Sequence, residues 1–183
     1  MFKIIVPLAE GYEEVEAITI IDILRRAGAM VTVAGLQTEA VTGSHGITIQ
    51  TDTLFNDVAD GSFDAIILPG GMPGARHLND DPRIIRLLQR MALEERLIGA
   101  ICAAPMVLHT AGLLAGKSFT MHPSVAHLVD LPRTDQAVVI DGRIITGRSA
   151  GAAMEFALAI VNLLYGESKT NELNRSIIYP LAG

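Results

Sequence analysis

Short runs of β-branched and other aliphatic residues alternate with longer amphipathic segments along this chain. The aliphatic runs are continuous and do not alternate with polar residues, which is typical of parallel strands covered on both faces. They predict strands at residues 2–8, 30–35, 64–68 and 97–101, and the amphipathic segments predict helices at 13–27, 106–114, 152–164 and 167–174. Strands that alternate with helices indicate an α/β fold with a doubly wound, mainly parallel sheet and helices on both faces.

Turn and capping signals place the ends of further elements. Asp81-Pro82 is the pattern of an N-cap followed by proline in the first helical turn. Asp141-Gly142 lies between two β-rich runs and predicts a hairpin over residues 138–146. Residues 41–52 look irregular or hairpin-like, and residues 118–121 are expected to be extended.

Composition narrows the class of protein. The 183 residues are 50% hydrophobic and 19% charged, which is the composition of a globular chain, and no repeat, linker or low-complexity tract divides them. We therefore expect one domain over residues 1–183. A formal net charge of −6 provides no basic surface for phosphate backbones, so nucleic acid is not an expected partner.

The first residues and the cysteine count bear on the compartment. Residues 1–7 lack the length and cleavage site of a signal peptide, and no uncharged apolar run approaches the roughly 18–20 residues that span a bilayer. Cys102 is the only cysteine, so the chain cannot form an internal disulfide, which fits a reducing compartment. We expect a cytoplasmic protein without a membrane anchor.

Cys102 follows the strand at residues 97–101, and Pro105 suits the first turn of the helix after it. The small residues around it allow a tight strand-to-helix turn that projects the thiol above the sheet edge, beside free helix N–H groups. Such a place lowers the pKa of a thiol and favours the nucleophilic thiolate. A free cysteine is equally often a small buried hydrophobic residue, so position alone leaves both interpretations open.

Several acidic residues begin the first helix, and a helical wheel separates them. Glu16 falls inside the apolar arc, whereas Glu14 falls outside it and Glu13 lies in the first turn, where a negative charge favours the helix dipole. Burial should raise the pKa of Glu16, and a protonated carboxyl could donate a hydrogen bond to a thiolate or exchange a proton during turnover. The alternative is a glutamate at the edge of the apolar stripe that reaches solvent.

Gly70-Gly71 ends the strand at residues 64–68, at the sheet edge where ligands bind in open α/β folds. The glycines allow the backbone to turn with exposed N–H groups. These donors could stabilise an oxyanion together with the N–H that follows Cys102. The alternative is an ordinary strand-ending turn.

The five histidines have different settings in the sequence. His122 precedes Pro123 at the start of an extended loop and is the best acid/base candidate. His109 fits the core side of an apolar helix, and His45 lies in a loop that could reach the mouth of a cleft. No two histidines have the H-x-x-x-H spacing and one cysteine cannot build a thiolate cluster, so no metal site is expected.

Four segments, in order, resemble the ThiJ/PfpI superfamily, in the branch that contains the parkinsonism-associated protein deglycase and its bacterial counterparts. They are residues 8–16 (LAEGYEEVE), 68–71 (LPGG), 100–105 (AICAAP) and 122–123 (HP), and the late helix adds residues 155–159 (EFALA). The resemblance covers nearly the whole chain. It implies a flavodoxin-like three-layer α/β/α sandwich of the class I glutamine amidotransferase-like type, which is usually homodimeric.

The same resemblance implies roles for the candidate residues. Cys102 would be the nucleophile and Glu16 its proton partner, while Gly71 and Ala103 would supply backbone donors and His122 would lie nearby in the pocket. Protease-like relatives carry histidine directly after the cysteine. Ala103 stands at that position in this chain, so a Cys-His peptidase would lack its base.

The activity implied by the resemblance is that of a cofactor-free, cysteine-dependent glyoxalase or protein deglycase. Such an enzyme acts on methylglyoxal, glyoxal or their early protein adducts and releases a hydroxyacid. The expected partners are therefore a small aldehyde or a glycated protein, and a second copy of the chain. The alternative is an oxidative-stress redox sensor or redox-regulated chaperone that uses the oxidation of Cys102. A third interpretation is an inactive relative kept for binding.

Overall fold

A mainly parallel sheet forms the centre of the protein. The computed structural model describes residues 1–179, so residues 180–183 of the expected domain lie outside the described part. Within residues 1–179 the central sheet has seven strands, and a two-stranded hairpin forms a second sheet. In spatial order the seven strands are β5 (Thr53–Leu54), β2 (Met30–Gly35), β1 (Lys3–Leu8), β6 (Ala65–Leu68), β7 (Leu97–Ile101), β9 (Ile144–Gly147) and β8 (Val138–Asp141).

Every pairing in the central sheet is parallel except the one between β8 and β9. This antiparallel pair is the hairpin predicted from Asp141-Gly142, and Gly142 supplies the left-handed φ of +64° at the turn. Strands β6 and β7 are buried along their whole length, which explains why their sequences are continuous aliphatic runs. The predicted mainly parallel sheet is confirmed.

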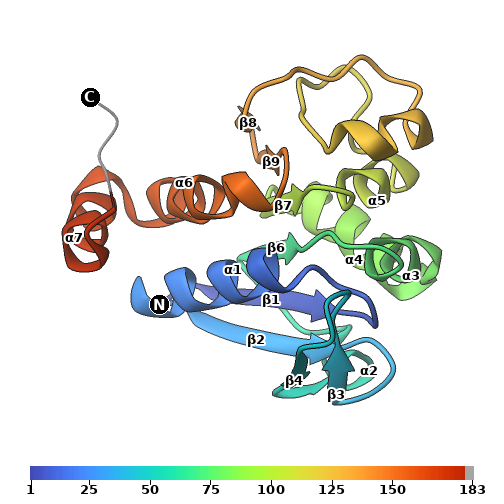
Figure 1. Ribbon diagram of the computed structural model, residues 1–183, viewed down its shortest axis with the longest axis horizontal. Coiled ribbons are helices and arrows are strands. Elements are labelled where there is room, and N and C mark those ends of the chain that lie inside the picture. The colour runs from blue at the N-terminus through green and yellow to red at the C-terminus, as the bar shows by residue number, and fades with distance from the viewer. Residues whose placement is uncertain (180–183) are drawn as a thin grey trace.

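Helices cover both faces of this sheet (Figure 1). One face carries α1 (Glu14–Arg26) and α6 (Ala153–Tyr165), which pack against each other, and α7 (Glu167–Ile177) packs on α6. The other face carries α2 (Phe55–Val58), α3 (Gly74–Asp80), α4 (Pro82–Leu93) and α5 (Pro105–Thr110). Along β1, Ile4 and Val6 pack in the apolar cluster beneath α1 and α6, and Ile5 packs in the cluster beneath α3, α4 and α5. The chain therefore forms the three-layer α/β/α sandwich that the resemblance implied.

Helix starts agree with the capping signals, but two helix ends differ from the prediction, and one of them is α7, which ends at Ile177 instead of residue 174. Asp81 caps α4 by accepting a hydrogen bond from the Arg83 N–H at 2.9 Å. Helix α5 ends at Thr110 although a helix was predicted as far as residue 114. Its end is closed by the glycine at position 112, which has a φ of +78°. None of the helices within residues 1–179 has the length and apolar content needed to cross a membrane.

The segments without strong periodicity take three forms. Residues 41–52 contain the antiparallel hairpin of β3 (Ala40–Thr42) and β4 (Thr48–Gln50). Residues 118–121 form no strand, and the short 3-10 helix η1 (Pro123–Leu128) follows them. A second 3-10 helix, η2 (Ala150–Ala152), leads into α6. The hairpin is one of the two forms that the sequence predicted for residues 41–52.

Candidate active site

Three segments meet at the carboxyl ends of β1, β6 and β7, which are neighbours in the sheet. Because these strands run parallel, their last residues lie at one edge of the sheet. The segment after β1 leads into α1 and carries Glu16, the segment after β6 is Gly70-Gly71, and the segment after β7 begins with Cys102. The structure therefore brings together three segments that the sequence analysis had selected separately.

Cys102 lies in a strained turn directly after β7. Its φ is +63°, in the left-handed region that residues other than glycine rarely adopt. Two backbone hydrogen bonds of 2.9 Å hold it there: its N–H donates to the Gly147 carbonyl, and its own carbonyl accepts from the His122 N–H. The side chain is partly buried. This turn fixes the direction of the thiol before any ligand binds.

Glu16 lies on the buried face of α1, as the helical wheel predicted, and has no solvent exposure. Its Oε2 accepts a hydrogen bond from the Gly70 N–H at 2.8 Å. Among the described residues, its buried Oε1 accepts no hydrogen bond of ordinary geometry. A buried carboxylate oxygen without such a partner is unusual, and the neighbouring Cys102 thiol interacts with this carboxyl. The free oxygen is suited to accept or return a proton.

Gly70 allows the carboxyl and the thiol to approach each other. A Cβ atom at this position would lie 2.7 Å from the Cβ of Cys102 and 2.8 Å from Oε2 of Glu16, which is closer than real Cβ atoms approach. Only glycine therefore fits between Cys102 and Glu16 without displacing one of the two side chains. Since the Gly70 N–H is bonded to Glu16, it does not serve as the oxyanion donor that the sequence suggested.

The buried pair of Glu16 and Cys102 is neutral below about pH 7 and carries one negative charge above it. Burial raises the pKa of Glu16 to about 7. Burial and the negative charge of Glu16 raise the pKa of the Cys102 thiol to about 12, and the Gly71 and Ala103 N–H groups only partly oppose this. The expectation that the turn lowers the thiol pKa is wrong, because it ignored burial and the adjacent carboxylate. Two such groups titrate as a unit, which holds two protons below about pH 7 and one proton above it.

A small cavity opens above Cys102. Its volume is about 140 Å³, and it is lined by Gly71, Met72, Cys102, Ala103, His122, Ser124 and Val125. This is below the roughly 300–1,000 Å³ of pockets that hold drug-sized ligands. Met72 and Ser124 were not found by the sequence analysis, because both lie in segments that were expected to be irregular. The cavity has room for a molecule of only a few heavy atoms.

His122 reaches this cavity with its ring held in one orientation. Its Nδ1 accepts a hydrogen bond from the Ser124 N–H at 3.2 Å and lies 2.7 Å from the Ser124 hydroxyl. A neutral ring that accepts at Nδ1 carries its proton on Nε2 and can donate from that side. The structure thus places His122 beside the pair formed by Cys102 and Glu16, at the cavity wall.

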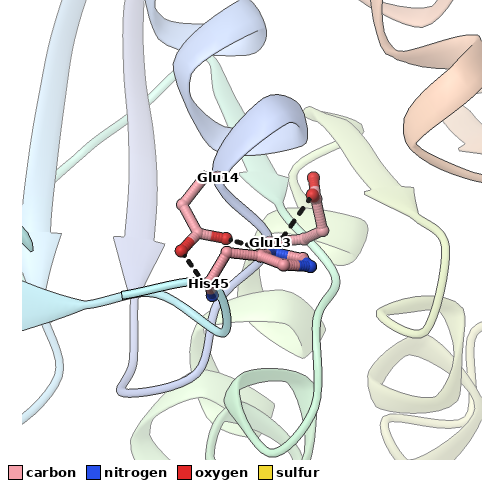
Figure 2. A group of neighbouring side chains, drawn as sticks. All are labelled: Glu13, Glu14 and His45. Atoms are coloured by element: carbon pink, nitrogen blue, oxygen red, sulfur yellow. Dashed lines mark hydrogen bonds and ion pairs between the residues drawn. The ribbon is translucent and has the colours of Figure 1, made fainter. Parts of the chain in front are cut away.

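A second cluster of ionisable residues lies next to the site and was missed by the sequence analysis. Glu13 and Glu14 of the α1 N-terminus face His45, in the turn between β3 and β4 (Figure 2). Glu14 is buried, although the helical wheel placed it outside the apolar arc, because the β3–β4 hairpin covers it. The wheel describes only one helix, so it cannot register cover from a segment about 30 residues away.

Glu14 anchors the hairpin to α1. Its Oε1 accepts hydrogen bonds from the His45 N–H at 2.6 Å and the Ile47 N–H at 3.3 Å, and its Oε2 lies 2.8 Å from His45 Nδ1. Burial alone would raise the pKa of Glu14, but these bonds outweigh it and lower the pKa to about 2. The carboxylate in turn raises the pKa of His45.

Among the described residues, the side chains of this cluster are of the types that bind metal ions and lie close enough together to share one. One ligand atom from each of Glu13, Glu14 and His45 lies within 4.8 Å of the others. Both oxygens of Glu14 already accept hydrogen bonds from the hairpin, and Glu13 Oε2 caps α1 by accepting from the Glu16 N–H at 2.8 Å. We therefore interpret this cluster as a structural contact of the hairpin.

Comparison with known sequences identifies relatives along nearly the whole chain. Residues 2–163 match the model of the DJ-1/PfpI family. The chain is 43% identical over 178 residues to protein dj-1beta of Drosophila melanogaster, covering 95% of each protein. It is 42% identical over 167 residues to the glutathione-independent glyoxalase DJR-1.2 of Caenorhabditis elegans, covering 90% of this chain and 89% of that protein.

A plant relative is longer. The DJ-1 homolog B of Arabidopsis thaliana is 38% identical over 179 residues, which is 96% of this chain and 41% of that protein. The chain thus spans less than half the length of this plant relative.

Solved structures agree with the fold. Oxidised DJ-1 of Toxoplasma gondii superposes with a TM-score of 0.94 at 36% identity, covering 99% of this chain and all of that one. DJ-1beta of Drosophila melanogaster gives a TM-score of 0.94 at 40% identity, covering 98% of this chain and 99% of that one. The matched sequence model, the extent of the identity and the shared fold together show that this chain belongs to the DJ-1/PfpI family.

Proposed function

We propose that the protein is a cofactor-free glyoxalase that converts methylglyoxal or glyoxal into the corresponding hydroxyacid at Cys102. The observation that carries this proposal is the contact between a buried carboxyl of raised pKa and the only thiol of the chain. A nucleophile beside a group that can accept and return its proton is what covalent catalysis on a carbonyl requires.

The first step is addition of the thiol to the aldehyde. The ionised Glu16 takes the thiol proton as sulfur bonds to the aldehyde carbon, so the thiolate forms only at the moment of attack. The Gly71 and Ala103 N–H groups already interact with the sulfur and lie beside the carbonyl oxygen as it gains charge. Protonation of that oxygen gives a hemithioacetal, and Glu16 is again a carboxylate.

The second step moves one proton between adjacent carbons. Glu16 removes the hydrogen from the former aldehyde carbon, which gives an enediol, and returns a proton to the neighbouring carbon. The aldehyde carbon is thereby oxidised to a thioester while its neighbour is reduced to an alcohol, so no external oxidant is needed. Water then cleaves the thioester and releases the hydroxyacid. His122 can donate from Nε2 to the second carbonyl oxygen.

Two further observations support a small aldehyde as substrate. The cavity of about 140 Å³ fits a molecule of few heavy atoms. A relative that is 42% identical over most of both chains is named as a glutathione-independent glyoxalase. An early protein adduct of the same aldehydes would present the same carbon skeleton at the mouth of the cavity, and it is the second substrate class that we propose.

We predict that Cys102→Ala produces no lactate from methylglyoxal and that Glu16→Gln loses at least about a hundredfold in kcat, the usual size of an acid/base contribution. Formation of lactate measured by a coupled assay tests both. His127→Gln is the control, because His127 is exposed on η1 and does not line the cavity. Lactate production by Cys102→Ala at the wild-type rate would rule out the proposed mechanism.

A redox function is the second candidate, and one observation favours it. The raised pKa leaves much of Glu16 protonated near neutral pH, so its carboxyl can donate a hydrogen bond to an oxidised sulfur and hold it at the sulfinate stage. Intact-mass and peptide spectrometry after mild peroxide should then find two oxygen atoms on Cys102, and fewer on Cys102 of Glu16→Gln. Oxidation confined to the methionines would count against this function.

We also propose that the protein forms a homodimer through the exposed side of α1. Val15 and Ile18 are 55% and 46% exposed there, and Ile47 of the adjacent hairpin is 57% exposed. The Ile47 N–H donates to Glu14, so the hairpin adjoins the start of α1, and exposed apolar residues on adjoining elements are suited to an interface.

A further inference from the structure

A pocket between α2 and α4 lies apart from the cavity at Cys102. Its volume is about 350 Å³, and it is lined by Asn56, Ala59, Asp60, Arg83, Arg86, Leu87 and Arg90. No residue lines both this pocket and the cavity above the thiol. Three of its seven lining residues are arginines, in a chain whose net charge is −6. The pocket is therefore a positive site on an acidic protein.

The spacing of the arginines along α4 explains how they meet. Arg83, Arg86 and Arg90 follow one another at intervals of three and four residues, so they form a single stripe along the helix. The neighbouring face of α4 carries buried aliphatic residues that attach the helix to the sheet. The amphipathic pattern of α4 thus turns all three guanidinium groups toward the same pocket.

The charge of two of these arginines is not neutralised within residues 1–179. Neither Arg86 nor Arg90 forms an ion pair there. Arg90 is held by three carbonyl oxygens of the turn after α2, at 2.6 Å from Gly61 and 3.4 Å from both Ala59 and Asp60. Carbonyls orient the guanidinium and leave its net charge intact. Arg90 also keeps its Nε–H and one Nη1–H without an acceptor.

The side chain of Arg83 lines the pocket and is held in place by its own contacts. Its Nε and Nη2 donate to the two oxygens of Asp81 at 3.0 and 2.6 Å, and its guanidinium stacks 5.6 Å above the Phe55 ring. Its Nη2 also donates to the Leu36 carbonyl at 3.2 Å, and its Nη1 donates to Asn56 Oδ1 at 3.4 Å. Arg86 has no hydrogen bond to a described residue through its side chain, so all five of its N–H groups can bind a ligand. For a ligand, Arg83 therefore keeps one N–H group, Arg90 keeps two and Arg86 keeps all five.

We propose that this pocket binds a small anion that carries phosphate groups. The planar fork of the Arg86 guanidinium matches a phosphate with two parallel hydrogen bonds. The remaining N–H groups of Arg83 and Arg90 can bind the further oxygens, which a phosphate has and a carboxylate lacks. Asp81 neutralises Arg83, and Asp60 is the only carboxylate among the lining residues, so the charges of Arg86 and Arg90 leave the pocket net positive. Because two of the three guanidinium groups are already oriented, little ordering is required on binding.

Calorimetric titration of the full-length protein with inorganic pyrophosphate, at constant ionic strength, tests this proposal. We expect one saturable site per chain in the wild type. Arg86→Gln should weaken binding by about tenfold, the effect of losing charge-assisted hydrogen bonds, and Arg86→Glu should abolish it. Arg86 is exposed and has no side-chain hydrogen bond, so neither substitution should impair folding.

Arg76→Gln is the matched control, because Arg76 is an exposed arginine on α3 that lies outside the pocket. It should bind pyrophosphate as the wild type does. Absence of saturable binding to the wild type would overturn the proposal. Equal weakening by Arg76→Gln and Arg86→Gln would also overturn it, because the effect would then come from the overall charge of the protein.

Discussion

Glu16 makes the folded protein less stable above neutral pH, for the same reason that it can act as an acid and a base. Its carboxyl is fully buried, and burial raises its pKa from 4.5 to about 7. The folded protein therefore binds this proton more tightly than the unfolded chain does. The stability associated with the protonated form is complete below pH 4.5 and is lost as the pH rises through about 7.

Glu16→Gln should remove this pH dependence, because glutamine keeps the shape of the side chain and carries no charge. Between about pH 5 and about pH 8, the free energy of unfolding of the wild type should fall by about 2 to 3 kcal/mol relative to that of the variant. Urea denaturation of both proteins at the two pH values measures the difference. A constant difference across this range would mean that the carboxyl has an ordinary pKa.

The parts of the site that depend on local patterns could be predicted from the sequence. The periodicity of α1 identified Glu16 as buried, and the strand-to-helix transition identified the turn at Cys102. The raised pKa of the thiol could not be predicted, because it arises from burial and from a carboxylate 86 positions away, and both come about only in the fold. The burial of Glu14 was missed for a similar reason.

At the scale of elements, Glu14 determines where the β3–β4 hairpin sits on α1. Its carboxylate accepts the His45 and Ile47 N–H groups, which have no partner in the short ladder of the hairpin itself. A two-stranded hairpin is marginally stable alone, and this contact attaches it together with hydrogen bonds between residues 10–12 and the hairpin. Because the Ile47 N–H donates to Glu14, the exposed Ile47 is held next to the first turn of α1.

Glu14→Gln should loosen this attachment, because a neutral amide replaces the acceptor of the charge-assisted bond from His45. We expect amide hydrogen exchange at positions 45 and 47 to become about tenfold faster. The raised pKa of His45, measured by NMR titration, should fall toward its ordinary value. Glu39→Gln changes an exposed carboxylate at the other end of the hairpin and should leave both readouts unchanged. An unchanged pKa of His45 in Glu14→Gln would refute the anchor.

The elements themselves were predicted well where periodicity was strong. Strands β1, β2, β6 and β7 and helices α1 and α6 appear within two residues of their predicted ends. Helix α3 was not predicted, because it begins in a segment rich in glycine and proline whose sequence is typical of a turn. Its helical form depends on packing against α4 and α5, which no local pattern records.

At the scale of the whole molecule, the proposed homodimer would cover the apolar side chains of α1 and the hairpin. Light scattering at micromolar concentration should give twice the 19.5 kDa mass of one chain. Ile18→Asp should shift the protein to the monomer, because a buried unpaired charge at an interface costs several kcal/mol. Leu93→Asp is the control, since Leu93 is 87% exposed at the end of α4. A monomeric wild type would exclude this interface.

The coupling of Cys102 to Glu16 is the central claim, and the pH dependence of Cys102 alkylation by iodoacetamide tests it most directly. The wild-type rate should rise with an inflection near pH 7, where the buried pair loses its first proton. In Glu16→Gln this inflection should disappear, and the rate should rise only above the ordinary thiol range, because burial still raises the pKa of the thiol. An inflection at the unperturbed value of about 8.5 in both proteins would contradict the account.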